Sequence, residues 1–485
     1  MSVTTPFMPY PEAAARALSR LAVLLFVVAC TATNADHSPT PTESASASAP
    51  ARVAATPTPT PVGYLVPVTG FMTLRDDIPL AELTDVLVPA AYESDAKRLL
   101  PKSKVTAVSP DAALLAKVRG RSTAIALLPP ALVDLSLKTL SLGGVYFWDP
   151  AADLSTYPLR LDGRADAALP TGRVWDMVAA GEMIFGRGVQ WRIEGRYAGD
   201  SRPAFDHVRD VTKSATLAVA TLEAPLSGAH NKYCDACVVF VGNEAYISGI
   251  SDAGIDLVTL AANHIGDGGP QGVLNTVRVL DSAHIAHVGA GADLAAAHRP
   301  AIVESGGVRI AFLGYTDVPP LDYVATDARP GSAWLSHDDP TYAELRAEIR
   351  AAKAQADLLV VMPHWGIEYE DRPRDVEVAA AHAMVEAGAD LIIGDHPHWV
   401  QSVELYQGAY VIYGIGNFVF DQMWSTETRE GSLQRLSFVG SRLVAVRIMP
   451  TLIEDFFQPR LLGATEPQYR QTLERIWGHS LVSGN

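Results

Sequence analysis

The chain has 485 residues, of which 38 are Lys or Arg and 54 are Asp or Glu, so its formal charge is −16. Hydrophobic residues make up 48% of the chain, which is typical of a globular protein and excludes disorder throughout. An acidic chain is unsuited to binding nucleic acid, because neutralising phosphates requires a basic surface. Three cysteines in a chain of this length exclude a fold built on disulfides.

Residues 1–29 have the pattern of an export signal. Arg16 and Arg20 precede the apolar run of residues 21–29, which is too short to span a bilayer. Residues 27–30, Val-Val-Ala-Cys, resemble a bacterial lipobox, and this resemblance implies that Cys30 is lipidated. We therefore expect an exported lipoprotein, anchored to the outer face of the cytoplasmic membrane. An ordinary secretory signal and a buried apolar helix remain alternatives.

Residues 30–62 consist mostly of Thr, Ser, Ala and Pro. Such a segment buries too little apolar surface to offset its ordering entropy, and its prolines keep it extended. We expect it to be a tether between the membrane anchor and the folded body.

Residues 63–165 are predicted to form a small α/β lobe. Asp76 and Asp77 are suitable caps for a helix over residues 80–87, and residues 124–128 have the pattern of a buried strand. The segments at 66–88 and 124–134 resemble parts of one lobe of periplasmic solute-binding proteins.

Residues 172–465 alternate between apolar strand-like runs and helix-like stretches, which indicates an α/β architecture. The predicted strands cover 174–179, 215–220, 256–260, 309–313, 358–361, 391–393 and 410–413. The predicted helices cover 272–282, 342–356 and 375–387.

Polar side chains follow these strands repeatedly. In open α/β sheets, binding sites lie beyond the carboxyl ends of the strands, so several segments can meet in one crevice. Together the segments supply two carboxylates, one amide and up to four imidazoles, a set that suits one or two divalent ions such as zinc, manganese or iron. The residues concerned are Glu182, Glu223, Asn263, His264, His364, His396 and His398.

The order of these motifs resembles the CapA/PgsA family of poly-gamma-glutamate capsule-synthesis proteins over residues 172–450. The matching segments are GEMIFGRGV, ATLEAPLSG, AANHIGDGG, MPHWGIEYE, GADLIIGDHPHWVQ and YGIGNFVFDQ. The resemblance implies a four-layer, metallophosphatase-like sandwich in which helices flank two mixed sheets.

The same resemblance implies roles for individual residues. Glu223 would be a bridging carboxylate between two metal ions. One ion would be held by Asn263, His364 and His396, and the other would be approached by Glu182 and His398. His264 would be the acid, or the imidazole that stabilises the transition state.

Three positions depart from the family pattern. Glu182 stands where the family has Asp, which moves the carboxylate by about one bond length, whereas metal distances tolerate only about 0.2 Å. Thr221 and Ala262 each replace an Asn that could bind or orient a ligand. A site with a single metal, or without metal, is therefore an alternative to the two-metal site.

Two further features are open to more than one interpretation. Cys234 and Cys237 form a CxxC pair, for which a local disulfide is the simplest interpretation in an exported protein. Free structural thiols, zinc binding and redox catalysis are the alternatives. Arg187 lies within the first motif and is a candidate catalytic residue, because it can meet a carboxylate or a phosphate with two hydrogen bonds. A surface ion pair is the alternative.

The favoured function is membrane-tethered synthesis, export or anchoring of poly-gamma-glutamate or a similar anionic polymer, with other capsule-synthesis proteins as possible partners. One alternative is a metal-dependent hydrolase that cuts a phosphoester or an amide. Another is a non-catalytic protein that binds the polymer through a degenerate metal site.

Overall fold

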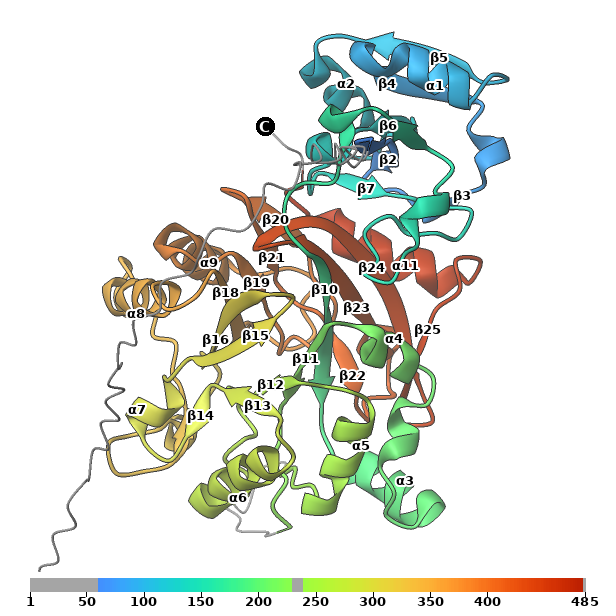
Figure 1. Ribbon diagram of the computed structural model, residues 1–485. Helices are drawn as coiled ribbons and strands as arrows, with labels where there is room; N and C mark the ends of the chain where they lie inside the picture. The colour runs from blue at the N-terminus through green and yellow to red at the C-terminus, as the bar shows by residue number, and fades with distance from the viewer. Residues whose placement is uncertain (1–59, 229–238, 483–485) are drawn as a thin grey trace, which may run out of the picture. The chain divides into compact units, whose positions relative to one another are not determined.

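The computed structural model describes residues 60–228 and 239–482, which belong to one compact unit spanning Pro59–Asn485 (Figure 1). The predicted export signal, Cys30 and most of the tether lie outside the described residues, as do Cys234 and Cys237. Across the described part of the chain, no helix combines the length and the apolar character needed to cross a membrane.

The first large sheet is mixed and has eight strands in the order β13-β12-β11-β10-β23-β24-β25, with β22 also paired to β10. Strands β10 to β13 and β22 are parallel, whereas β23 to β25 continue the sheet in antiparallel fashion. The strands are β10 (Val174–Met183), β11 (Leu217–Leu222), β12 (Leu257–Thr259), β13 (Ala286–Val288), β22 (Asn417–Val419), β23 (Glu430–Val439), β24 (Arg442–Glu454) and β25 (Gln458–Leu461).

The second large sheet has six strands in the order β15-β16-β18-β19-β21-β20. Its four central strands are parallel, and an antiparallel strand closes each edge. The strands are β15 (Ala301–Ser305), β16 (Val308–Thr316), β18 (Leu358–His364), β19 (Leu391–Ile393), β20 (Val403–Tyr406) and β21 (Ala409–Ile412).

The two sheets face each other across a shared apolar core. Successive residues of a strand point to opposite faces, so Met177 of β10 and Val360 of β18 enter the core between the sheets. Their neighbours Val178 and Val361 point outward, each against a layer of helices. Both faces of each sheet are therefore buried, which explains the continuously apolar strand sequences.

Helices cover the outer faces, as Figure 1 shows. The first sheet is covered by α3 (Arg187–Tyr197), α5 (Ile247–Asp252) and α6 (Gly269–Ser282), and the second by α8 (Ala343–Lys353) and α9 (Asp375–Ala387). This is the four-layer, metallophosphatase-like sandwich predicted from the sequence. The remaining α-helices after residue 172 are α4 (Arg209–Ser214), α7 (Leu294–Ala297), α10 (Thr426–Arg429) and α11 (Pro467–Gly478).

A smaller α/β lobe precedes the sandwich. Its sheet has the order β5-β4-β6-β2-β7, and its core also takes in Val439, Val444 and Ala445 from the ends of β23 and β24. The division into 63–165 and 172–465 stays a prediction. The lobe elements are β2 (Val66–Gly70), β4 (Asp85–Pro89), α1 (Glu93–Leu99), β5 (Lys104–Val108), α2 (Asp111–Val118), β6 (Ala126–Leu128) and β7 (Leu137–Thr139).

Short two-stranded pairings complete the described structure. They join β1 (Val62–Tyr64) to β9 (Arg160–Asp162), β3 (Asp77–Ile78) to β8 (Ser141–Leu142), and β14 (Ala290–Gly291) to β17 (Gly331–Ser332).

The predicted helix over residues 80–87 is wrong. Leu80–Glu82 form a single 3-10 turn, and the chain then enters β4. Val86 and Val88 are fully buried while Asp85 is exposed, so this segment follows the two-residue period of a strand. The predicted strand at 124–128 is confirmed by β6, and the seven strands and three helices predicted for the sandwich are all present, with bounds that shift by a few residues.

Candidate functional site

The parallel strands of both sheets end at one edge and carry their polar residues there. Glu182 of β10 lies opposite Thr221 of β11 on one side and Asn417 of β22 on the other. In the second sheet, His364 ends β18 and pairs with Asp395, which follows β19. Residues far apart in sequence therefore converge where open α/β folds bind ligands.

Glu182, Glu223 and His398 form a compact, buried cluster. Each offers one oxygen or nitrogen atom, and these atoms all lie within 4.8 Å of one another. A Glu182 carboxylate oxygen lies 2.6 Å from Nδ1 of His398, and its other oxygen accepts a 2.7 Å hydrogen bond from the backbone N–H of His396. Neither carboxylate oxygen of Glu223 has a hydrogen-bond partner among the described residues.

The pKa values of the cluster reflect this burial and proximity. Burial raises the pKa of the Glu223 carboxyl to about 7. Burial acts the same way on Glu182, but the nearby His398 charge outweighs it and lowers the pKa of Glu182 below its usual range. For His398 the carboxylate of Glu182 outweighs burial and raises the imidazole pKa above its usual value. Without a bound ion, the ionised forms of His398 and Glu182 therefore stabilise each other, whereas a metal ion would take the neutral imidazole as its ligand.

The cluster fits a divalent cation. Two carboxylates and one imidazole are a donor set that zinc, manganese and iron accept. A buried carboxylate without partners is destabilising, and a cation beside Glu223 would satisfy it. Within residues 60–228 and 239–482, this is the one group of three acidic, His or Cys side chains whose ligand atoms come so close.

The other three predicted metal ligands form a chain of contacts beside this cluster. The imidazole of His364 lies 3.1 Å from Oδ1 of Asn263 and 3.1 Å from Nδ1 of His396, both measured to Nε2. Its Nδ1 lies 2.8 Å from Asp395, which also accepts a hydrogen bond from the Thr221 hydroxyl. Burial opposes protonation of His364, but the Asp395 carboxylate outweighs it and raises the imidazole pKa. Burial lowers the pKa of His396 well below its usual value.

The backbone around these contacting side chains is tightly constrained. His396 and His398 adopt positive φ angles of 93° and 58°, a region that is unfavourable for residues other than glycine and is found at functional sites. Gly181 leaves room for the backbone of Gly416, because a Cβ atom at position 181 would lie 1.8 Å from the Gly416 carbonyl oxygen. The β10–β22 contact that places Glu182 therefore requires glycine at 181.

His264 and Arg187, the two predicted catalytic residues, each contact a carboxylate of their own. His264 Nδ1 lies 2.9 Å from Asp267, and the rings of His264 and Phe240 lie 4.1 Å apart between centroids and are tilted by 36°. The Arg187 guanidinium lies 4.2 Å above the Phe240 ring and forms two hydrogen bonds to Asp421. The positive charge of Arg187 is therefore balanced by an acidic residue within the protein.

The side chains of Asp395 and Asn417 contribute to the site, although neither was predicted from the sequence to have a role there. Asp395 orients His364, and Asn417 places its Oδ1 3.0 Å from Nδ1 of His398. The Asn417 amide is itself oriented by donating to Gln422 and to the Thr428 carbonyl. A carboxylate directly before a His-x-His segment, and an amide in a Gly-x-Gly-Asn segment, were the available sequence signals.

The departures from the family pattern have local structural consequences. The carboxylate of Glu182 lies 2.6 Å from Nδ1 of His398, and the register between β10 and β11 shifts between Ala179 and Glu182. The Thr221 hydroxyl contacts Asp395, so this position still contributes a polar group to the site. Ala262 is buried and contributes none.

Comparisons with known proteins place this site within the part of the chain that one family model matches. The family model described as Bacterial capsule synthesis protein PGA_cap matches residues 176–422. The capsule biosynthesis protein CapA of Bacillus anthracis is 32% identical over 58% of this chain and 67% of its own length. The PGA biosynthesis protein CapA of Bacillus subtilis is 33% identical over 52% of this chain and 65% of its own.

A probable polyglutamine synthesis accessory protein of Mycobacterium tuberculosis is 32% identical over 45% of this chain and 60% of its own length. The chain thus spans about two thirds or less of these relatives. Among solved structures, the sulfate thiohydrolase SoxB of Thermus thermophilus in complex with glycerol matches 63% of this chain and 60% of its own, with a TM-score of 0.33 and 12% identity.

Proposed function

The chain belongs to the bacterial capsule synthesis protein family PGA_cap, and on that premise we propose that it acts in the synthesis, export or anchoring of poly-gamma-glutamate or a similar anionic polymer. The polymer would bind at a metal-binding crevice formed where the carboxyl ends of the parallel strands of both sheets meet. Other capsule-synthesis proteins would be its partners.

The observation that carries this proposal is the buried Glu223 carboxylate, which lies beside Glu182 and His398. Its two oxygens lack hydrogen-bond partners among the described residues. These three side chains would hold a divalent ion, with Asn263, His364 and His396 adjacent to it. The ion would supply positive charge and Lewis acidity toward a polymer carboxylate or amide oxygen. Asp395 holds His364 in one orientation, which directs the Nε2 atom of His364 toward Asn263 and His396.

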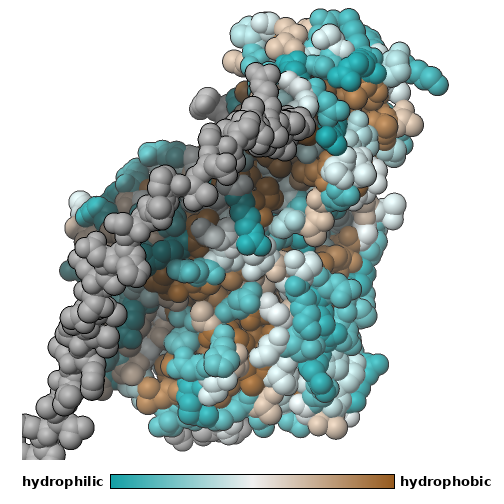
Figure 2. Space-filling model, in the orientation of Figure 1, coloured by the Kyte–Doolittle hydropathy of each residue, from teal (hydrophilic) through white to brown (hydrophobic). Residues whose placement is uncertain are grey.

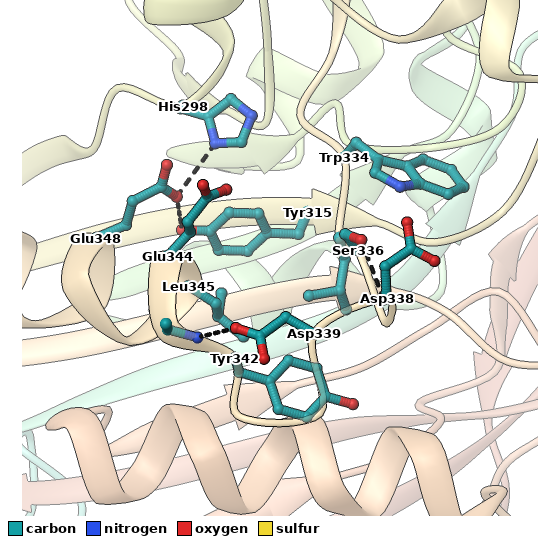
Figure 3. Close-up of a pocket in the computed structure, with 12 residues that line it drawn as sticks. His298, Tyr315, Trp334, Ser336, Asp338, Asp339, Tyr342, Glu344, Leu345 and Glu348 are labelled. Carbon is teal, nitrogen blue, oxygen red and sulfur yellow. Dashed lines mark hydrogen bonds and ion pairs between the residues drawn. The ribbon is translucent and has the colours of Figure 1, made fainter.

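A pocket beside helix α8 is unsuited to an anionic polymer. It has a volume of about 400 Å³ and lies beside α8, where Figure 3 shows Glu348 near His298 and Tyr315. Four carboxylates line it, and its lining includes neither Lys nor Arg. Repulsion between these carboxylates and the polymer favours binding at the strand edge. The lining acids are Asp338, Asp339, Glu344 and Glu348.

Hydrolysis of a phosphoester or an amide at the same edge is a second candidate function. It is favoured by His264, whose imidazole is partly exposed and oriented by the buried Asp267. An imidazole held in this way can transfer a proton to or from a substrate.

We also propose that the protein is exported and tethered to the outer face of the cytoplasmic membrane through a lipid on Cys30. The apolar run at 21–29, the lipobox-like residues 27–30 and the Pro-rich segment at 30–62 support this location. Replacing Cys30 with Ala should move the protein from the membrane fraction to the soluble fraction, and an unchanged distribution would contradict it.

Gene replacement tests the capsule role. Deleting the gene in its own bacterium should reduce the surface glutamate polymer, measured as glutamate released by acid hydrolysis. The wild-type chain should restore the polymer and Glu223→Gln should not, while Glu304→Gln, which changes an exposed glutamate, is the matched control. An unchanged polymer after deletion would refute the proposed role. Activity on a phosphodiester with Mn²⁺ that is lost in Glu223→Gln would favour the hydrolase.

A further inference from the structure

Two large aromatic side chains lie exposed beside the metal-binding cluster. Tyr369 and Trp424, which we call the aromatic rim, are 36% and 62% exposed and meet edge to face with ring centroids 6.1 Å apart. The Tyr369 ring lies 5.9 Å from the imidazole of His398. The face in Figure 2 mixes hydrophilic and apolar residues, and single exposed apolar side chains are ordinary. Here the two exposed rings contact each other, and the Tyr369 ring also contacts a candidate metal ligand, which is a more specific arrangement.

The aromatic rim and the cluster are held together by hydrogen bonds. Asn417 contacts His398 through Oδ1 and donates through Nδ2 to Gln422, and Gln422 in turn donates to the Tyr369 hydroxyl over 3.4 Å. The backbone N–H of Tyr369 donates to the carbonyl of Pro397 over 2.8 Å, between the two histidines of the site. Tyr369 also has a positive φ of 66°, so its ring is presented by a constrained backbone.

The spacing of the two exposed rings matches one kind of polymer chain. Five backbone bonds separate equivalent atoms in a γ-linked glutamate chain, so an extended chain advances about 6 Å per residue, against at most about 3.6 Å for an α-linked chain. The 6.1 Å separation of the exposed Tyr369 and Trp424 rings corresponds to the γ-linked repeat.

The chemistry of the rings favours the same chain. Aromatic faces carry partial negative charge, which disfavours a carboxylate and favours methylene groups. A γ-linked chain has two methylenes per residue within its backbone. An α-linked chain has the same composition and charge, but its methylenes lie in side chains that end in carboxylates.

We propose that the aromatic rim selects γ-linked over α-linked polyglutamate. The two rings pack against the backbone methylenes of successive residues while a carboxylate of the polymer faces the cluster. This inference rests on the proposed polymer-binding function. Tyr369 and Trp424 are thus specificity residues.

Binding of two isomeric probes tests this selection. The full chain in detergent is titrated with fluorescent L-glutamate oligomers of equal length, one γ-linked and one α-linked, and affinity is read from anisotropy. The wild type should prefer the γ-linked probe by about tenfold, as expected when methylenes lose an apolar contact. Trp424→Ala should bring this ratio close to one without changing the metal content.

Matched variants separate the rim from general effects. Trp191→Ala removes a tryptophan that is equally exposed, at 63%, and packs on Arg192, and it should keep the preference. Tyr369→Phe keeps the ring and should also keep it, whereas Tyr369→Leu should lose it. Equal wild-type affinity for both probes, or a preference that survives Trp424→Ala, would overturn only the proposed selection by the aromatic rim and not the binding of the polymer. Absence of binding to either probe would overturn the polymer-binding function as well.

Discussion

Thr221 in the first sheet donates its hydroxyl hydrogen bond to Asp395, which follows β19 of the second sheet and is 174 residues away in sequence. Asp395 also holds His364, so a single carboxylate joins the two sheets at the edge where the site lies. The orientation of His364 therefore depends on the packing of both sheets.

Removal of the Thr221 hydroxyl should weaken this connection. We predict that Thr221→Val lowers the free energy of unfolding by about 1–2 kcal/mol, because buried Asp395 loses a hydrogen-bond donor. Urea denaturation in the presence of EDTA measures the change. Thr221→Ser keeps the hydroxyl and is the control, and equal losses in both variants would argue against the hydrogen bond as the cause.

Asp395→Asn should weaken metal binding without removing a ligand. The substitution keeps the size of the side chain but changes the charge that orients His364, and such partners of metal-bound histidines typically contribute about 10–100-fold in affinity. Competition with a chelator of known affinity gives the change. Asp322→Asn alters an exposed carboxylate and should leave the affinity unchanged. Identical affinities for wild type and Asp395→Asn would show that His364 lies outside the metal site.

Glu223→Gln should have opposite effects on metal binding and on metal-free stability. The substitution removes a ligand, so the metal content measured by elemental analysis should fall. It also removes a buried charge without partners, so the EDTA-treated protein should gain about 2 kcal/mol at neutral pH.

The pH dependence of that gain follows from the raised pKa. The Glu223 carboxyl titrates near 4.5 when unfolded and near 7 when folded, so its charge destabilises the fold increasingly as pH rises from 4.5 to 7. The stabilisation by Glu223→Gln should therefore be absent at pH 4 and complete above pH 7, as measured by thermal unfolding of the chelated protein. A gain that does not vary with pH would contradict burial of the ionised carboxylate.

Gly181→Ala should disrupt the strand edge. The added Cβ would meet the Gly416 carbonyl oxygen at 1.8 Å, which requires a backbone shift between β10 and β22 and a loss of about 3 kcal/mol or more. Gly195→Ala is the control, since it lies in helix α3 with open space around it and should stabilise the protein by about 0.5–1 kcal/mol. Comparable urea midpoints for the two variants would refute the close approach at Gly181.

The alternation of apolar runs and helix-like stretches predicted an α/β architecture, and the resemblance to the CapA/PgsA family implied the four-layer sandwich, while the assignment of the site stays a prediction. Apolar runs such as 358–361 identify strands buried on both faces, and the polar residues that follow them must meet because parallel strands end at one edge. The helix expected at 80–87 was wrong because a local cap signal competed with the two-residue alternation of Val86 and Val88. The long antiparallel strands β23 and β24 were missed, since their mixed sequences become strands only when paired with β10 and each other.

The contacts of each polar residue at the site could not be inferred from the sequence, because they depend on the folded structure. Arg187 is balanced by Asp421, 234 residues away, while both oxygens of Glu223 lack partners among the described residues. Asp395 and Asn417 acquire their roles by lying beside His364 and His398. The physical reason is that strand periodicity and direction are local properties of the chain, whereas hydrogen bonding, burial and charge balance depend on neighbours that folding brings from distant segments.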